Sequence, residues 1–140
     1  MATTEDDAKL WAAYRSTSYQ ALDRDEVLWT VRLGKIAPRP GPMAYITSDN
    51  PGSRQLSARA NQQRRSAFRE RLQRQEHRFL DGRSIDDEGI WPDEQGFWVL
   101  STTPEEARRL GSALGQRAVL FVDADGQVSL QACERSDNRL

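Results

Sequence analysis

The order of predicted strands and helices between residues 43 and 122 constrains the fold more than any other feature of the sequence. Residues 57–76 have helical spacing after the capping residue Ser57, and a second helix is predicted from Pro104, after Thr103. Apolar stretches rich in β-branched and aromatic residues predict strands at 43–48, 77–80, 96–101 and 118–122. The resulting order βαββαβ predicts an α+β, ferredoxin-like split βαβ fold, an antiparallel sheet with both helices on one face.

The flanking segments add elements to this core. Apolar residues near helical spacing at 5–22 predict an N-terminal helix, and residues 27–33 predict an additional strand. A turn at 123–126 predicts a C-terminal hairpin strand. The length of 140 residues suits one domain, 1–140, in which residues 134–140 are expected to form a frayed tail.

The composition restricts the possible functions. A single cysteine and a single histidine cannot form an intrachain disulfide or a His/Cys metal site, and no glycine-rich phosphate-binding motif occurs, so neither metal nor cofactor is predicted. No apolar stretch approaches the roughly 18 residues of a membrane span, and the acidic N-terminus does not resemble a signal peptide. A soluble, cytoplasmic protein with no membrane partner is expected, and its oligomeric state is left open.

Opposite charges are concentrated in two adjacent segments. Residues 54–78 carry eight arginines and two glutamates, whereas residues 81–106 carry eight acidic residues and one arginine. Arginine suits phosphate and carboxylate recognition, so nucleic-acid binding through the Arg-rich helix 57–76 is an alternative function. The two segments could also face each other.

Polar side chains are predicted to converge where strands meet helices. The strand 96–101 runs antiparallel to the strand 43–48 in the expected sheet, so the start of one lies beside the end of the other. The polar residues placed near this edge are Asn50, Asn61, Arg64, Glu94 and Gln116.

This arrangement suits a binding site for a small anionic ligand or a partner protein. Arg64 and helix N–H groups would hold the anion, while the amides and Glu94 would orient it. In an enzyme, Glu94 would be the candidate general base and Arg64 would stabilise developing negative charge. Alternatively, the same side chains satisfy the backbone of irregular loops.

Several short motifs together resemble those of a known family. The segment Thr47-Ser48-Asp49-Asn50-Pro51 resembles Thr-Ala-Trp-Asn-Pro, and Asn61 with Arg64 resembles Asn-x-x-Arg. Trp91 with Glu94 resembles the start of Trp-x-x-Glu-x-Ser, and Gly115-Gln116-x-Ala118 resembles Gly-Gln-x-Ala. In these motifs the chain is similar to an uncharacterised family of small bacterial single-domain proteins, a domain of unknown function, over roughly residues 14–122.

The resemblance implies site positions and no chemistry. It adds Thr47 and Trp91 to the candidate ligand-binding residues. Two positions depart from the family pattern, because Asp49 replaces an aromatic residue and Gly96 replaces a serine. If these positions shape a pocket, the resemblance implies that the pocket of this chain is altered.

Overall fold

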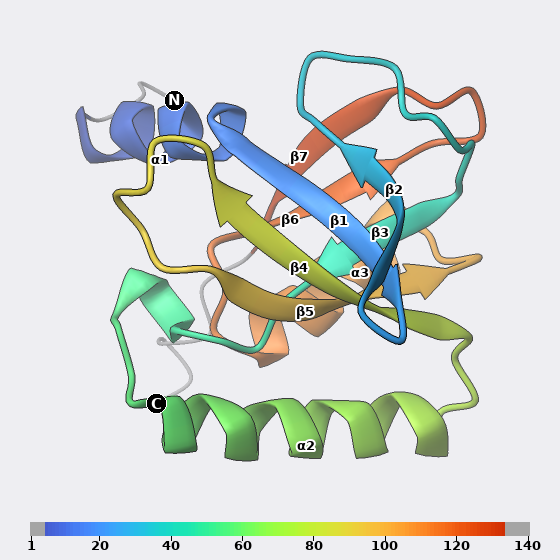
Figure 1. Cartoon of the computed structure of the whole chain (residues 1–140). Helices are drawn as coiled ribbons and strands as arrows, with labels where there is room; N and C mark the ends of the chain where they lie inside the picture. The colour runs from blue at the N-terminus through green and yellow to red at the C-terminus, as the bar shows by residue number, and fades with distance from the viewer. Residues whose placement is uncertain (1–4, 134–140) are drawn as a thin grey trace.

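A single antiparallel sheet of seven strands organises the computed structural model, which describes residues 5–133 (Figure 1). The strand order across the sheet is β2-β1-β4-β5-β3-β6-β7, and every adjacent pair is antiparallel. The strands are β1 (Thr17–Asp23), β2 (Glu26–Val31), β3 (Met43–Ile46), β4 (Phe79–Asp86), β5 (Glu94–Leu100), β6 (Ala118–Val122) and β7 (Val128–Ala132). The helices are α1 (Glu5–Arg15), α2 (Ala58–Arg74) and α3 (Pro104–Ala113), with a short 3-10 helix, η1 (Pro51–Ser53). The described residues therefore form a mixed α+β fold, as predicted.

The two long predicted helices begin where their capping residues indicated. Ser57 Oγ accepts a hydrogen bond from Ala60 N at the start of α2, and Thr103 Oγ1 accepts one from Glu106 N at the start of α3. Each bond satisfies a backbone N–H that has no partner inside its helix. Local sequence therefore fixes both helix starts.

The prediction of one helix over residues 5–22 is wrong beyond residue 15. The helix α1 ends at Arg15, and Thr17 Oγ1 donates to Ala13 O at 2.7 Å just after its end. Residues 17–23 form β1, which pairs with β2 on one side and β4 on the other. Pairing along both edges outweighs the weak helical pattern of this segment.

The predicted strand at 77–80 is too short. The observed β4 continues to Asp86 because it lies between β1 and β5 and pairs with both. The loop between β4 and β5 is consequently confined to 87–93, and Glu94 is the first residue of β5, opposite Ser84. This pairing places Glu94 on the sheet itself.

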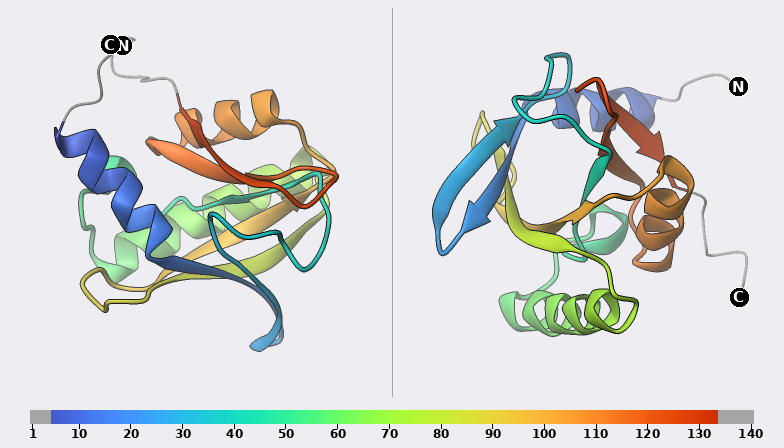
Figure 2. Two further views of the ribbon diagram at one scale, coloured as in Figure 1. Left: turned by 90° about the horizontal axis from the view of Figure 1, so that it is seen from above. Right: turned by 90° about the vertical axis from the view of Figure 1, so that its right-hand side faces the viewer.

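The sheet buries a different apolar cluster on each face. On the convex face, Ile46 and Phe97 pack against Phe68 and Leu72 of α2, in a cluster that also includes residues of α3. Side chains of the opposite strand parity, among them Trp98, form the second cluster on the concave face. Figure 2 shows the sheet curling around this concave face, with α1 lying across its opening.

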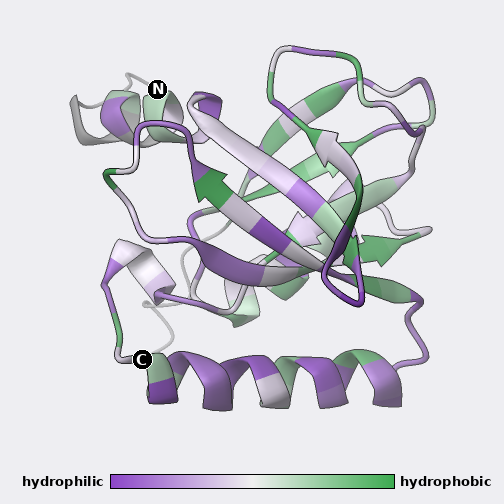
Figure 3. Cartoon of the chain, in the orientation of Figure 1, coloured by the Kyte–Doolittle hydropathy of each residue, from purple (hydrophilic) through white to green (hydrophobic). Residues whose placement is uncertain are grey.

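The outer surface of α2 is strongly polar (Figure 3). Its buried residues are Asn61, Phe68 and Leu72, which recur at helical spacing along one face. Within the described residues, no helix is long and apolar enough to cross a membrane. The expected frayed tail 134–140 lies outside the described residues.

Two glycines make room for a buried tyrosine ring on the concave face. Gly82 and Gly96 are paired across β4 and β5. A Cβ at Gly96 would lie 2.7 Å from the Tyr45 ring and 2.8 Å from Ile46 O, and one at Gly82 would lie 2.8 Å from the same ring. These separations are below van der Waals contact, so the glycine pair allows Tyr45 to lie flat across the sheet.

We therefore expect Gly96→Ser to lower the free energy of unfolding by about 1–3 kcal/mol, since overpacking displaces Tyr45 or the backbone of β3. The adjacent Gln95 side chain is exposed, so Gln95→Ala is the matched control and should change the stability by less than about 0.5 kcal/mol. Urea denaturation of both variants measures the difference. Equal stability of Gly96→Ser and wild type would contradict this account of Gly96.

Candidate functional site

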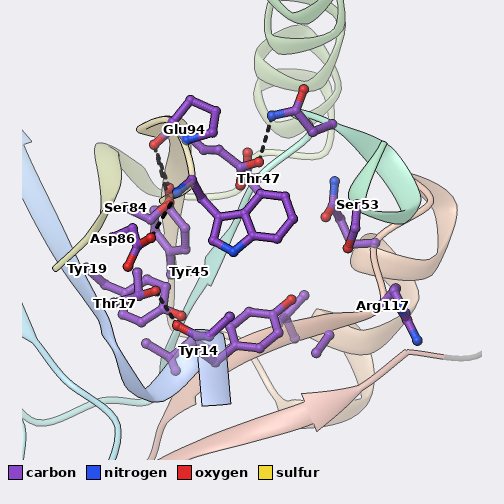
Figure 4. A pocket seen from close by; sticks show the side chains of 18 of the residues that line it. Tyr14, Thr17, Tyr19, Tyr45, Thr47, Ser53, Ser84, Asp86, Glu94 and Arg117 are labelled. Carbon is purple, nitrogen blue, oxygen red and sulfur yellow. Dashed lines mark hydrogen bonds between the residues drawn. The ribbon is translucent and has the colours of Figure 1, made fainter. Parts of the chain in front are cut away.

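A pocket of about 400 Å³ opens at the edge of the sheet where β3 and β5 meet η1 and α1 (Figure 4). Five of the seven predicted ligand-binding residues line it, whereas Asn61 and Arg64 do not. The five are Thr47, Asn50, Trp91, Glu94 and Gln116. The polar strand-to-helix edge therefore borders a real cavity.

The side chain of Asn50 connects the two elements that were expected to converge. Asn50 Nδ2 donates to Glu94 Oε2 at 2.7 Å, while Asn50 Oδ1 accepts from Asn61 Nδ2 at 2.9 Å and from Leu56 N at 2.8 Å. Asn61 Oδ1 in turn accepts from Asn50 N at 3.0 Å. Asn61 thus supports the pocket from behind, through Asn50.

The direction of this network is fixed by its backbone members. Because Leu56 N is a donor, the oxygen of the Asn50 amide must face it, and the amide nitrogen must face Glu94. Asn50 also has φ 48° and ψ 60°, a left-handed conformation that asparagine tolerates better than most residues. Asparagine at this position therefore serves both the turn and the network.

The carboxyl group of Glu94 is the principal titratable group on this side of the pocket. Burial raises its pKa above the ordinary value, and the negative charge of Asp49 raises it further, while the hydrogen bond from Asn50 acts in the opposite direction. In the described part of the chain, the Asn50 amide is the donor that contacts this carboxylate. Glu94 thus retains acceptor capacity on the pocket side.

The guanidinium of Arg64 does not reach the pocket. Its Nε donates to Ser48 O at 2.6 Å, and one terminal nitrogen donates to Leu114 O at 2.5 Å. Arg64 therefore ties the turn after β3 to the end of α3. The sequence analysis expected Arg64 to hold an anion in the site, but in the structure its guanidinium contacts two backbone carbonyl groups outside the pocket.

Asp49 stabilises the back of the turn. Both of its carboxylate oxygens lie within 3.0 Å of an Arg65 terminal nitrogen, and Oδ2 also accepts from Gln95 N at 3.2 Å. Burial raises the pKa of Asp49, against the opposing effects of Arg65 and Gln95 N. Asp49 is thus engaged with α2 and β5.

The Gly-Gln pair after α3 packs directly on the turn that contains Asn50. Gln116 Nε2 donates to Asp49 O at 2.9 Å, and Gly52 N donates to Gly115 O at 2.8 Å. A Cβ at Gly115 would lie 3.0 Å from Pro51 Cβ, at a positive φ of 77°. Glycine at this position permits both the close approach and the left-handed backbone.

Thr47 and Trp91 border the pocket from different elements. Thr47 Oγ1 donates to Gln95 O at 2.6 Å and accepts from Asp49 N at 3.0 Å. Trp91 lies in the loop between β4 and β5, and the residue is 54% exposed. The Asp86 carboxylate accepts the N–H groups of three residues in this loop, including Trp91 N at 2.9 Å, and these bonds lower the pKa of Asp86.

Three tyrosines that the sequence did not assign to the site complete its walls. Figure 4 shows Tyr14 of α1, Tyr19 of β1 and Tyr45 of β3 facing the same hollow as Glu94. The Tyr19 hydroxyl is buried and has no hydrogen-bond partner among the described residues. The segment 17–23 was predicted to be helical, so Tyr19 was not placed on a strand that faces this pocket.

The chemical resources of the pocket thus include aromatic surface, hydroxyl groups, the recessed carboxylate of Glu94 and the cationic side chains of Lys9 and Arg117. Among the described residues, no group of three His, Cys, Asp or Glu side chains is arranged to hold a metal ion. Binding and general acid–base chemistry are the two capabilities that this set of groups supports.

We expect Asn50→Asp to destabilise the protein by about 2–3 kcal/mol at neutral pH, because it replaces the donor facing Glu94 with a second carboxylate oxygen. Aspartate keeps the tolerance for the left-handed turn and the acceptor for Leu56 N. In the double variant Asn50→Asp with Glu94→Gln, the side chain at position 94 becomes the donor and the one at position 50 the acceptor. This variant should recover much of the lost stability. Denaturation of the full cycle measures this coupling, and additive effects would refute the network.

Glu94→Gln should be more stable than wild type near pH 7.5. The folded state holds the Glu94 proton more tightly than the unfolded chain, so the contribution of this group to stability falls as pH rises from the ordinary carboxyl range through the raised pKa. Glutamine abolishes this titration. The difference in Tm between Glu94→Gln and wild type should therefore shrink as pH falls toward about 4. A pH-independent difference would contradict a raised pKa at Glu94.

Comparison with known proteins identifies a family. The model of a family described as a protein of unknown function (DUF3293) matches residues 46–119, which is 74 of the 140 residues. No curated protein and no solved structure matches the chain. The matched segment extends from the end of β3 into β6 and contains Asn50, Asn61, Glu94 and Gln116. The expected resemblance to a family of unknown function is thus confirmed, and the chain belongs to the family DUF3293.

Proposed function

We propose that this protein binds a small organic molecule in the pocket bordered by Asn50 and Glu94. The observation that carries the proposal is the Asn50 network, which holds a carboxylate at the edge of an aromatic-lined cavity. Such concave, mostly apolar sites with a few oriented polar groups are typical of ligand pockets. The buried Tyr19 hydroxyl, which lines the pocket without a protein partner, offers a further polar contact.

The contacts of the cationic side chains give less support to an anionic ligand than the sequence did. An anionic ligand was expected from Arg64, whose donors are directed to Ser48 O and Leu114 O. The cationic residues that do line the pocket are Lys9 and Arg117, and each has an interaction of its own. An anionic ligand would therefore have to compete for these two side chains.

Catalysis at Glu94 is the second candidate function. The raised pKa of Glu94 is the specific observation that favours it, since a general base works best with a pKa near the operating pH. Its orientation through Asn50 matches the support that catalytic carboxylates need. Arg64 would then act by positioning the turn, because its guanidinium contacts two carbonyl groups.

Nucleic-acid binding through α2 and protein binding at the pocket edge remain alternatives with less support. Several arginines of α2 already have partners within the protein. Arg64 and Arg65 donate hydrogen bonds to acceptors in the turn after β3, and Arg69 forms an ion pair with Asp81. A terminal nitrogen of Arg74 lies 3.7 Å from a carboxylate oxygen of Glu70. Base stacking would need exposed aromatic rings, but the aromatic residues Tyr45, Phe97 and Trp98 of the central strands are all buried. The exposed Ile90 and Trp91 are the apolar residues that a protein partner would meet near the pocket.

We also propose that residues 43–122 form a ferredoxin-like core, and that the protein is bacterial and cytoplasmic. The order β6-β3-β5-β4 supports the core, because each helix then connects two parallel strands separated by one antiparallel strand. The single cysteine is consistent with a reducing compartment. In this view, α1, β1, β2 and β7 are additions that deepen the concave side of the sheet.

A fragment screen by two-dimensional NMR tests the binding function. Hits should shift resonances of Trp91, Glu94 and Tyr14, and Trp91→Ala should weaken their binding at least fivefold, because it removes one aromatic wall. The Trp91 ring is largely exposed, so its removal should change the stability by less than about 1 kcal/mol.

Arg64→Ala separates a ligand contact from a structural role. It should cost about 2–4 kcal/mol of stability, because two charge-assisted hydrogen bonds are lost. Fragment affinity should remain within twofold, provided that the variant is studied where it is folded. A library that shifts no pocket resonance would refute the binding function.

A further inference from the structure

The donors and acceptors that line the pocket are unequally used. Asn50 Nδ2 donates to Glu94 Oε2, Gln116 Nε2 donates to Asp49 O, and Thr47 Oγ1 donates to Gln95 O. These three side-chain donors are thus directed at protein acceptors. The Glu94 carboxylate, in contrast, still has lone pairs to offer. A ligand at this position meets an acceptor and should supply the donor.

The aromatic residues come from four separate parts of the chain. Tyr14 lies on α1, Tyr19 on β1, Tyr45 on β3 and Trp91 in the loop 87–93. Tyr19 and Tyr45 are in ring contact, with centroids 5.4 Å apart and planes tilted by 60°. Aromatic faces carry partial negative charge, and rings that surround a site beside a carboxylate favour a positive group.

We propose that the pocket selects ligands bearing a positively charged nitrogen, such as a primary or methylated ammonium group, held against Glu94 between the tyrosine and tryptophan rings. This inference rests on the proposed function, because it names the ligand class of the same pocket. Desolvation strengthens the attraction, since a cation and a carboxylate interact more strongly when water is excluded. The expected ligand is therefore a small organic cation.

The other charged groups around the pocket do not supply an alternative partner for such a cation. The Asp86 carboxylate is occupied by three loop N–H groups, and Asp49 is paired with Arg65. Lys9 and Arg117 also line the pocket and would repel a cation placed close to them. The nitrogen is therefore assigned to the Glu94 side, where the carboxylate accepts the Asn50 hydrogen bond.

Cation binding should depend on pH through Glu94. Burial raises the pKa values of Tyr14, Tyr19 and Tyr45, so these groups stay neutral at physiological pH, whereas backbone hydrogen bonds lower the pKa of Asp86. Glu94 must be ionised to attract the ligand, so affinity should rise with pH through its titration. Asp49, which also has a raised pKa, is still present in a Glu94→Gln variant, so that variant is the control for a pH dependence caused by Asp49.

Three probes of one shape and different charge test the inference: benzylamine, benzyl alcohol and benzoate. Their binding is followed by NMR titration of the full chain at pH 7.5, at millimolar concentrations suited to fragments. Benzylamine should bind at least tenfold more tightly than benzyl alcohol, and benzoate most weakly. Phenyltrimethylammonium should also bind, because cation–π attraction does not require an N–H donor.

Glu94→Gln should lower the benzylamine affinity at least fivefold and remove its pH dependence, while leaving the benzyl alcohol affinity within twofold. Glu105→Gln is the matched control, because the Glu105 side chain is 66% exposed on α3, and it should change neither affinity. The NMR spectrum reports directly that each variant is folded.

The outcomes separate this inference from the proposed function. Tighter binding of benzyl alcohol or benzoate, with shifts at the same pocket resonances, would overturn the cation class and support a binding pocket. Benzylamine shifts that persist in Glu94→Gln would also overturn the assignment. If none of the four probes shifts a pocket resonance, the cation class is refuted. The fragment screen then tests the binding function independently.

Discussion

The hydrogen bonds of the Asn50 side chain hold the candidate site together. One amide, in a left-handed backbone conformation, accepts from Leu56 N and Asn61 Nδ2 and donates to Glu94. It thereby connects the turn after β3, the first turn of α2 and the first residue of β5. Buried amides are costly when unsatisfied, so removing any one partner leaves a polar group without compensation.

The polar residues around this amide have two positions: some line the pocket, and others lie behind it and hold the first group in place. Glu94 and Trp91 border the pocket, whereas Asn61 and Arg64 act from behind through Asn50, Ser48 O and Leu114 O. The constellation of polar residues read from the sequence therefore mixes two physical roles. In the proposed binding function, only the first of these roles would determine which ligand binds.

The ionised form of Glu94 is at an energetic disadvantage in this arrangement, for which the proposed binding function would give a reason. Burial and the charge of Asp49 disfavour ionised Glu94, and the Asn50 amide compensates in part. Groups that are kept in destabilising environments are frequently functional, because activity and stability place different demands on a site. Glu94 combines this disadvantage with a position beside three tyrosines, which makes it the most informative residue for experiments.

The sequence by itself determined the helix starts at Ser57 and Thr103, the α+β class, and the polar edge at which Asn50 and Glu94 lie. These features depend on local chemistry: capping oxygens, strand composition and turn residues act on near neighbours in the chain. They are readable because each signal is contained within a few residues.

Tertiary structure alone decided the identity of β1, the length of β4 and the aromatic walls of the pocket. The strand β1 exists because β2 and β4 pair with it on both edges, and no local pattern encodes those partners. Likewise, the side chain of Arg64 has several acceptors within reach, and only the folded chain places Ser48 O and Leu114 O at its donors. Long-range pairing and side-chain direction depend on residues far apart in sequence, which is why the sequence identified the edge and the structure identified its pocket.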